Sequence, residues 1–96
     1  MNLVGTDFQI KVWKAIAKIP KGKVKTYKEL AKSISMPKAA RAVANACGKN
    51  PYPVKIPCHR VIRSDGKIGG YSGKGGAKMK KSLLKNEGVF LGNERV

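Results

Sequence analysis

Acidic residues are scarce in this sequence of 96 residues. Five Asp and Glu stand against 21 Lys and Arg, which leaves a formal net charge of +16. A folded surface with so little negative charge carries a strong positive field and attracts polyanions, so nucleic acid is the first partner to consider. The basic residues are spread from Lys11 to Lys85, which fits a folded basic domain better than a charged tail. Charge alone also fits a ribosomal or chromatin-like protein.

Histidine and cysteine are also few, with one His and two Cys in the chain. A structural zinc site usually takes four such ligands, so we expect no metal and no cofactor. Cys47 and Cys58 stand in different settings, and we expect both to be free thiols in a reducing compartment. No apolar run comes near the roughly 20 residues that a membrane span needs, and the N-terminus lacks a signal-peptide pattern. We therefore expect a soluble cytoplasmic protein with no membrane partner.

The length and a hydrophobic content of 42% allow one core, so residues 1–96 are expected to form a single domain. Two capping boxes, each a Thr followed three residues later by Gln or Glu, predict where the first two helices start. They are Thr6 with Gln9, opening a helix over 6–19, and Thr26 with Glu29, opening a helix to about Ile34 with Leu30, Ala31 and Ile34 facing inward.

Pro37 predicts the start of a third helix, because proline is favoured in the first turn and cannot continue the helix before it. Small residues recur along this helix at helical spacing, and Gly48 is placed to cap its end. They are Ala39, Ala40, Val43, Ala44 and Cys47. Two short helices joined by three residues, the second basic and small-faced, resemble a helix-turn-helix. Plain helical cores contain similar pairs, so DNA docking and scaffolding both stay open.

The second half of the chain is predicted to be less regular. Segment 50–53 should be extended, because a residue before proline is pushed away from the helical region, and it should lead rigidly into 54–57. Residues 61–62 and 67–68 flank a turn signal and predict a short β-hairpin. Residues 69–76 are dense in glycine and read as a surface loop, and a last helix is expected from about 77 to 87. The fold class is therefore mainly α with a short β-hairpin.

Cys58 is the candidate nucleophile because it precedes the only histidine and follows a proline-stiffened approach. In an extended segment the two side chains would point to opposite sides, so His59 would act as a base through a bridging water. Glu87 is the best candidate for the carboxylate that orients such a histidine, because the other acids include two caps and a turn residue. Isolated Cys-His pairs are more often core residues. Cys47, on the small-residue face, is assigned to packing.

Seven segments, in order and at similar spacing, resemble the O6-alkylguanine-DNA alkyltransferases over about residues 5 to 88. The signature is Pro57-Cys58-His59-Arg60-Val61-Ile62. The others are FQIKVW (8–13), TYKELA (26–31), PKAARAV (37–43), NP (50–51), GYSG (70–73) and LLKNEG (83–88). The resemblance implies the winged helix-turn-helix-like C-terminal domain of that family, with the family's N-terminal domain absent.

The activity implied by the resemblance is irreversible transfer of an alkyl group, such as methyl, from O6-alkylguanine in duplex DNA to Cys58. The target base would first be flipped out of the stack, and each protein molecule would act once. The resemblance further implies that His59 activates Cys58 through water, that Glu87 polarises His59, and that Asn50 holds the local backbone.

For the DNA, the resemblance implies a helix in the minor groove, which admits only short side chains. Tyr27 would press on the phosphate beside the target nucleotide, and Arg41 would enter the stack where the base has left. The DNA contacts are then Tyr27, Lys28, Arg41 and Ser64, and the base pocket is Val61, Gly69, Tyr71 and Ser72. The expected partner is double-stranded DNA containing O6-alkylguanine, bound by a monomer.

Three other functions compete with this interpretation. An alkyltransferase-like protein recognises the damage without accepting the group, but in such proteins the nucleophile is replaced, commonly by tryptophan. A plain basic helix-turn-helix module leaves segment 57–60 without a role. A cysteine hydrolase would need an oxyanion-hole motif, and none is evident.

Overall fold

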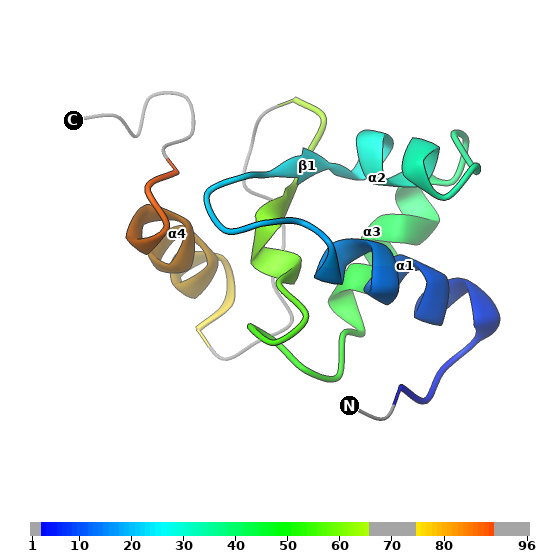
Figure 1. The fold of residues 1–96 in the computed structure, drawn as a ribbon, viewed down its shortest axis with the longest axis horizontal. Coiled ribbons are helices and arrows are strands. Elements are labelled where there is room, and N and C mark those ends of the chain that lie inside the picture. Colours follow the sequence, from blue (N-terminus) through cyan, green and yellow to red (C-terminus); the bar gives the residue numbers. More distant parts are fainter. Residues whose placement is uncertain (1–2, 66–74, 90–96) are drawn as a thin grey trace.

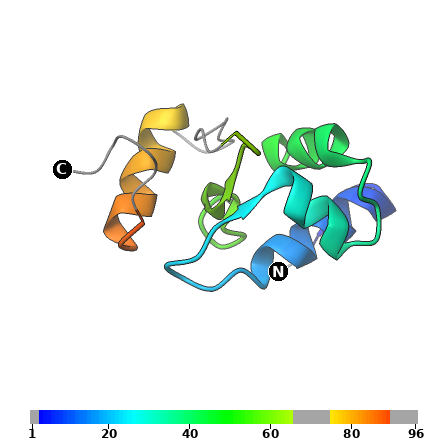
Figure 2. The same cartoon turned by 90° about the horizontal axis from the view of Figure 1, so that it is seen from above.

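The computed structural model describes residues 3–65 and 75–89, and within these ranges the chain is mainly helical (Figure 1). The elements in order are α1 (Asp7–Ala17), β1 (Lys25–Thr26), α2 (Tyr27–Ser33), α3 (Ala40–Gly48), the 3₁₀ helix η1 (Cys58–Arg60), β2 (Val61–Ile62) and α4 (Gly76–Asn86). Helices α1, α2 and α3 gather on one side of the molecule and α4 lies on the other, with β1 and η1 between them (Figures 1 and 2).

Both predicted capping boxes are confirmed. The Thr6 hydroxyl accepts a hydrogen bond from Gln9 N at 3.0 Å, while Gln9 Oε1 accepts one from Thr6 N at 2.9 Å. Thr26 and Glu29 make the same pair of bonds, at 3.0 and 2.9 Å. Each box satisfies backbone N–H groups that have no partner within the helix, which typically contributes about 1 kcal/mol. The boxes therefore fix where α1 and α2 begin.

The predicted start of the third helix is wrong by three residues, because α3 begins at Ala40 rather than at Pro37. Met36 N donates to Ala31 O and Ala39 N donates to Met36 O, both at 2.9 Å. Pro37 therefore lies in a turn, where its fixed φ is as suitable as in the first turn of a helix. This turn reverses the chain between α2 and α3, as a helix-turn-helix requires.

The segment predicted to be extended, 50–53, leads directly into a turn. Ile56 N donates to Tyr52 O at 2.8 Å, which closes a tight turn, and Val54 at its tip has a φ of +76°. The prolines restrict φ at their own positions but do not prevent a turn between them. The segment is a compact loop that leads from α3 to η1.

The two strands form a parallel pair in which Lys25 lies opposite Val61 and Thr26 opposite Ile62. The sequence predicted a hairpin partner for 61–62 instead, but that partner, 67–68, lies outside the described residues. The parallel pairing has a direct consequence for the site. It fixes the start of α2 beside the segment that carries Cys58.

The core lies mainly between the first three helices and η1. Trp13 is buried, and its Nε1 donates to Ala46 O at 2.8 Å, which ties α1 to α3 across the core. The predicted inward face of α2 is confirmed, since Leu30, Ala31 and Ile34 are all buried. None of the described helices is long and apolar enough to cross a membrane.

Candidate functional site

Cys58 lies in a sharp turn rather than in an extended segment. Pro57 has φ −78° and ψ 64°, the values of an inverse γ-turn, and Cys58 N donates to Ile56 O at 2.7 Å. The 3₁₀ helix η1 follows, closed by a bond from Arg60 N to Pro57 O at 2.9 Å. Side chains alternate between opposite sides only in an extended segment, so this alternation does not apply to Cys58 and His59. Both side chains are buried.

Asn50 holds this turn from inside the protein. Its Nδ2 donates to Ile56 O at 2.7 Å, and its Oδ1 accepts from Tyr52 N at 2.9 Å. Asn50 is buried at 5% exposure, so these bonds are made away from water. A buried amide with both ends bonded rigidifies its surroundings. Asn50 thus fixes the carbonyl to which the Cys58 backbone is also bonded.

His59 is joined to Glu87, 28 residues further along the chain, at the C-terminal end of α4. The distance from His59 Nε2 to Glu87 Oε2 is 3.0 Å, and the His59 side chain is only 1% exposed. An ionised carboxylate can only accept hydrogen bonds, so Nε2 carries the proton and donates it. The other ring nitrogen, Nδ1, is then a lone-pair base. It is buried and has no hydrogen-bond partner among the residues that the structure describes.

Arg60 completes this cluster, although the sequence analysis assigned it no role. Its Nε donates to Glu87 Oε1 at 2.9 Å and its Nη2 to Glu87 Oε2 at 2.6 Å, a two-pronged contact with both carboxylate oxygens. Its Nη1 donates to Ile19 O at 2.7 Å. The scarcity of acidic residues could have pointed to Arg60. Because few carboxylates are present, an arginine next to His59 is expected to bind the same carboxylate as the histidine.

The bonds from Arg60, followed by those from His59, lower the pKa of Glu87 to about 2. A lowered pKa means that the folded protein holds the ionised form more strongly than the unfolded chain does, so the resulting stability is complete above the ordinary value of 4.5. We expect the free energy of unfolding to decline as the pH falls from about 4.5 to about 2, and to decline less in a Glu87→Gln variant. Denaturant titrations at several pH values measure this, and equal slopes would contradict it.

Lys80 was missed by the sequence analysis and is fully buried on α4. Burial lowers the pKa of its ammonium to about 8, and electrostatic interactions with Cys47 and Cys58 oppose that shift. Its Nζ also lies 5.8 Å from the centre of the Tyr27 ring. Its spacing in the sequence could have predicted this position. Lys80 precedes the apolar Leu84 by four residues and Glu87 by seven, which places all three on the inward face of one helix. Lys80 therefore brings a buried ammonium into electrostatic contact with both cysteines.

A basic hollow of about 470 Å³ brings together three of the predicted DNA contacts, Tyr27, Arg41 and Ser64. Arg63, which the sequence analysis did not single out, also lines it, and pairs with Asp65 at 2.9 Å on the surface. Burial and the nearby cysteines raise the pKa of Tyr27 to about 12, so its hydroxyl stays neutral at physiological pH. Tyr27 directly follows β1, which pairs with β2, and Arg63 directly follows β2, so the hollow lies beside the strand that comes after η1.

The other predicted site residues that the structure describes do not line the hollow. Lys28 is exposed on α2 and does not line the hollow, and Val61 is buried in β2 beside η1. Three base-pocket residues, Gly69, Tyr71 and Ser72, lie outside the described residues. The structure thus joins two groups, a buried thiol with a histidine base and an open basic surface, through Tyr27. Such an arrangement can bind a polyanion and present a nucleophile to it.

Comparisons with known proteins agree on one family. The model of "6-O-methylguanine DNA methyltransferase, DNA binding domain" matches residues 7–89. A methylated-DNA–protein-cysteine methyltransferase of Methanosarcina barkeri is 55% identical over 86% of this chain and 51% of its own length. The crystal structure of Mycobacterium tuberculosis OGT in complex with DNA has a TM-score of 0.85 and 50% identity, covering 90% of this chain and 52% of that one.

A shorter relative is matched more completely. The structure of S. pombe Atl1 in complex with damaged DNA containing O6-carboxymethylguanine has a TM-score of 0.76 and 39% identity, over 92% of this chain and 82% of that one. By contrast, the chain spans about half the length of the methyltransferases of M. barkeri and M. tuberculosis.

Proposed function

The chain belongs to the family of 6-O-methylguanine DNA methyltransferase DNA-binding domains, and we propose that it repairs O6-alkylguanine in duplex DNA by moving the alkyl group to its own Cys58. The observation that carries the proposal is the buried bond between His59 and Glu87 immediately beside Cys58. It leaves His59 Nδ1 as a base inside the protein, which a thiol needs to become a nucleophile.

In the proposed reaction the Cys58 thiol gives its proton to His59 Nδ1, directly or through a water molecule. The sulfur then attacks the alkyl carbon, a new S–C bond forms, and the bond from that carbon to O6 of the guanine breaks. The guanine leaves with the electron pair and takes up a proton, so that normal guanine is restored. The thioether that remains on Cys58 has no route back to a thiol, because no second nucleophile displaces it. Each molecule therefore acts once.

The electrostatics of the cluster support this chemistry. Glu87 stays ionised far below neutral pH and stabilises the imidazolium that forms when His59 takes the proton. The buried ammonium of Lys80 interacts with Cys58 and offsets the cost of a thiolate in a low-dielectric interior.

The reacting atom lies inside a duplex, so the base must leave the stack, at a cost of a few kcal/mol. The hollow lined by Tyr27 and Arg41 supports this step, because it carries two arginines, Arg41 and Arg63, and lies beside the strand that follows the Cys58 turn. Arg41 is exposed at the start of α3 and would take the place of the flipped base, and the neutral Tyr27 hydroxyl would donate to a backbone phosphate. Ala40 and Ala44 on the same helix leave it narrow enough for a minor groove.

Recognition of damage without transfer is the second candidate. Its support is the similarity to the Atl1 structure with O6-carboxymethylguanine DNA, of which the chain covers 82%. The presence of a cysteine at position 58, with His59, Glu87 and Asn50 arranged around it, favours transfer.

Stoichiometry separates the two functions. A duplex carrying O6-methylguanine is incubated in excess with the protein, and the guanine restored is measured by chromatography of the digested DNA. We expect restored guanine to equal the protein in moles and then to stop, because each Cys58 is consumed. A duplex that keeps all its methyl groups, although the protein binds it more tightly than undamaged DNA, would establish recognition alone. Continued turnover would contradict the single use of Cys58.

A further inference from the structure

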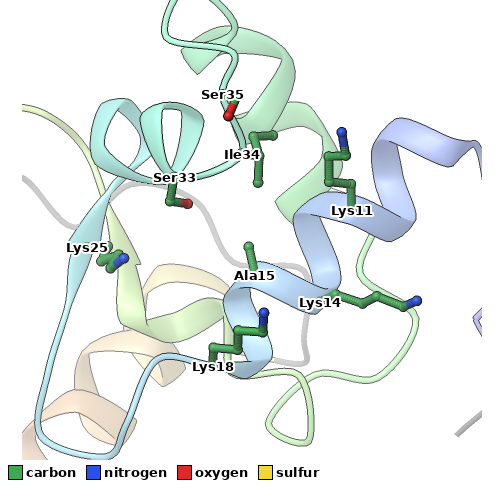
Figure 3. Close-up of a pocket in the computed structure, with 8 residues that line it drawn as sticks. All are labelled: Lys11, Lys14, Ala15, Lys18, Lys25, Ser33, Ile34 and Ser35. Atoms are coloured by element: carbon green, nitrogen blue, oxygen red, sulfur yellow. The ribbon is translucent and has the colours of Figure 1, made fainter.

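A second basic hollow, which we call the lysine groove, lies between α1 and the C-terminal end of α2 (Figure 3). It encloses about 470 Å³. Four lysines line it: Lys11 and Lys14 on α1, Lys18 directly after its last residue, and Lys25 on β1. Figure 3 shows Lys11 and Lys18 on either side of Ala15, facing the end of α2. None of the described residues that line the groove is acidic.

The concentration of charge in the groove is not explained by the stability of the fold. Lys11, Lys14 and Lys18 follow one another at intervals of three and four residues, so they share one helix face, where like charges repel. All three are exposed. The helix dipole favours lysines only in the last turn of α1, which accounts for Lys14 and Lys18 but not for Lys11. A bound polyanion would relieve the repulsion among all three.

The lysine groove is separate from the hollow in which the proposed function places the damaged duplex. The two share no lining residue. In Figure 1 helix α1 lies in front of α3, and Figure 2, seen from above, places them toward opposite faces. A duplex docked on Arg41 and α3 therefore leaves the groove open to another ligand.

We propose that the lysine groove binds the phosphate backbone of a second DNA segment, so that one protein molecule bridges two segments. Lysines are flexible point charges and suit a repeated series of phosphates, which release counterions when they are neutralised. Between the lysines the groove is lined by Ala15, Ile34 and two serines, and the Ser33 hydroxyl already donates to Leu30 O at 2.6 Å, so the lysines are the main groups that can hold an anion. The choice of DNA among polyanions rests on the proposed function, which brings the protein to DNA.

The three lysines on and directly after α1 make the best test, because Lys25 also interacts with Glu29 and lowers its pKa. The groove variant carries Lys11→Gln, Lys14→Gln and Lys18→Gln. The control variant carries Lys78→Gln, Lys81→Gln and Lys85→Gln, three exposed lysines of α4 with the same spacing and the same loss of charge. Thermal unfolding is measured for both variants to establish that they fold.

The assay tethers an undamaged duplex to beads, saturates it with protein, and measures capture of a second, fluorescent duplex. We expect the parent and the control variant to capture it, and the groove variant to capture about tenfold less, with a salt dependence weaker by about two to three in log–log slope for three phosphate contacts. No capture by the parent, or equal capture by the two variants, would overturn the proposal. Bridging by two protein molecules face to face would also leave the groove variant unchanged.

Two further experiments distinguish the reasons for which the capture assay could fail. Vesicles of phosphatidylcholine and phosphatidylserine in equal parts replace the second duplex, and groove-dependent binding to vesicles without capture of DNA would overturn DNA as the ligand. An Arg41→Ala variant should weaken attachment to the tethered duplex and leave the groove intact. Because the assay uses undamaged DNA, a protein that bridges duplexes but never methylates Cys58 would sustain this inference and refute the proposed function.

Discussion

A Cys58→Ala variant is expected to restore no guanine in a duplex that carries O6-methylguanine, while still binding that duplex. The loss should be complete, because the sulfur is the proposed acceptor and its replacement leaves no atom to form the new bond. Binding should persist because Tyr27, Arg41 and Arg63 line a hollow of which Cys58 is not a lining residue. The two measurements are chromatography of the digested DNA and a titration of labelled duplex with protein.

Cys47→Ala is the matched control. Burial raises the pKa of the Cys47 thiol to about 12, so at neutral pH it is protonated and a poor nucleophile. We expect this variant to repair at the parent's stoichiometry and to lose only about 1 kcal/mol of stability from a small cavity. If the Cys58→Ala variant repaired the duplex and the Cys47→Ala variant did not, Cys47 rather than Cys58 would be the acceptor.

The second large effect is expected from Glu87→Gln. A glutamine cannot carry the negative charge that stabilises a protonated His59, so we expect the single-turnover rate of methyl transfer to fall about 100-fold or more. The substitution also leaves the Arg60 guanidinium, which is 15% exposed, without its carboxylate. Breaking such a pair from one side typically costs about 3 kcal/mol. Rapid-quench measurements give the rate and denaturant titrations give the stability.

An Arg60→Gln variant distinguishes two causes of a slower reaction, the loss of the carboxylate that orients His59 and a general loss of stability. It removes the contacts to Glu87 and Ile19 but leaves the bond between Glu87 and His59. We expect Arg60→Gln to destabilise the protein to a similar degree and to slow transfer only a few-fold. Glu29→Gln, in the distant capping box, should leave the transfer rate unchanged. Equal rate losses in Glu87→Gln and Arg60→Gln would mean that the cluster supports the fold and not the chemistry.

Local signals in the sequence were sufficient for the helix starts that depend on neighbouring residues. The capping boxes at Thr6 and Thr26 involve a residue only three positions away, and both form as expected. Glu87 could be selected by elimination, because only five acids exist in the chain. The inward face of α2 followed from its apolar residues.

What the sequence did not reveal depends on contacts between distant segments. Arg60 bonds to Ile19 and Glu87, which are 41 and 27 residues away, and no local pattern announces either partner. Lys80 was not recognised because lysine is almost never fully buried, although it shares a helix face with Leu84. The turn that the bond from Ile56 N to Tyr52 O closes was not predicted either, because prolines restrict their own φ and the residue before them but do not reveal the path of the chain between them.

Locating the alkyl group after the reaction shows whether Cys58 itself receives it. The protein is incubated with a duplex whose O6-methylguanine carries a deuterated methyl, and is then digested and sequenced by mass spectrometry. We expect one deuterated methyl per molecule, on the sulfur of Cys58. A label on Cys47 or elsewhere, or a protein that carries none after the duplex has bound, would contradict it.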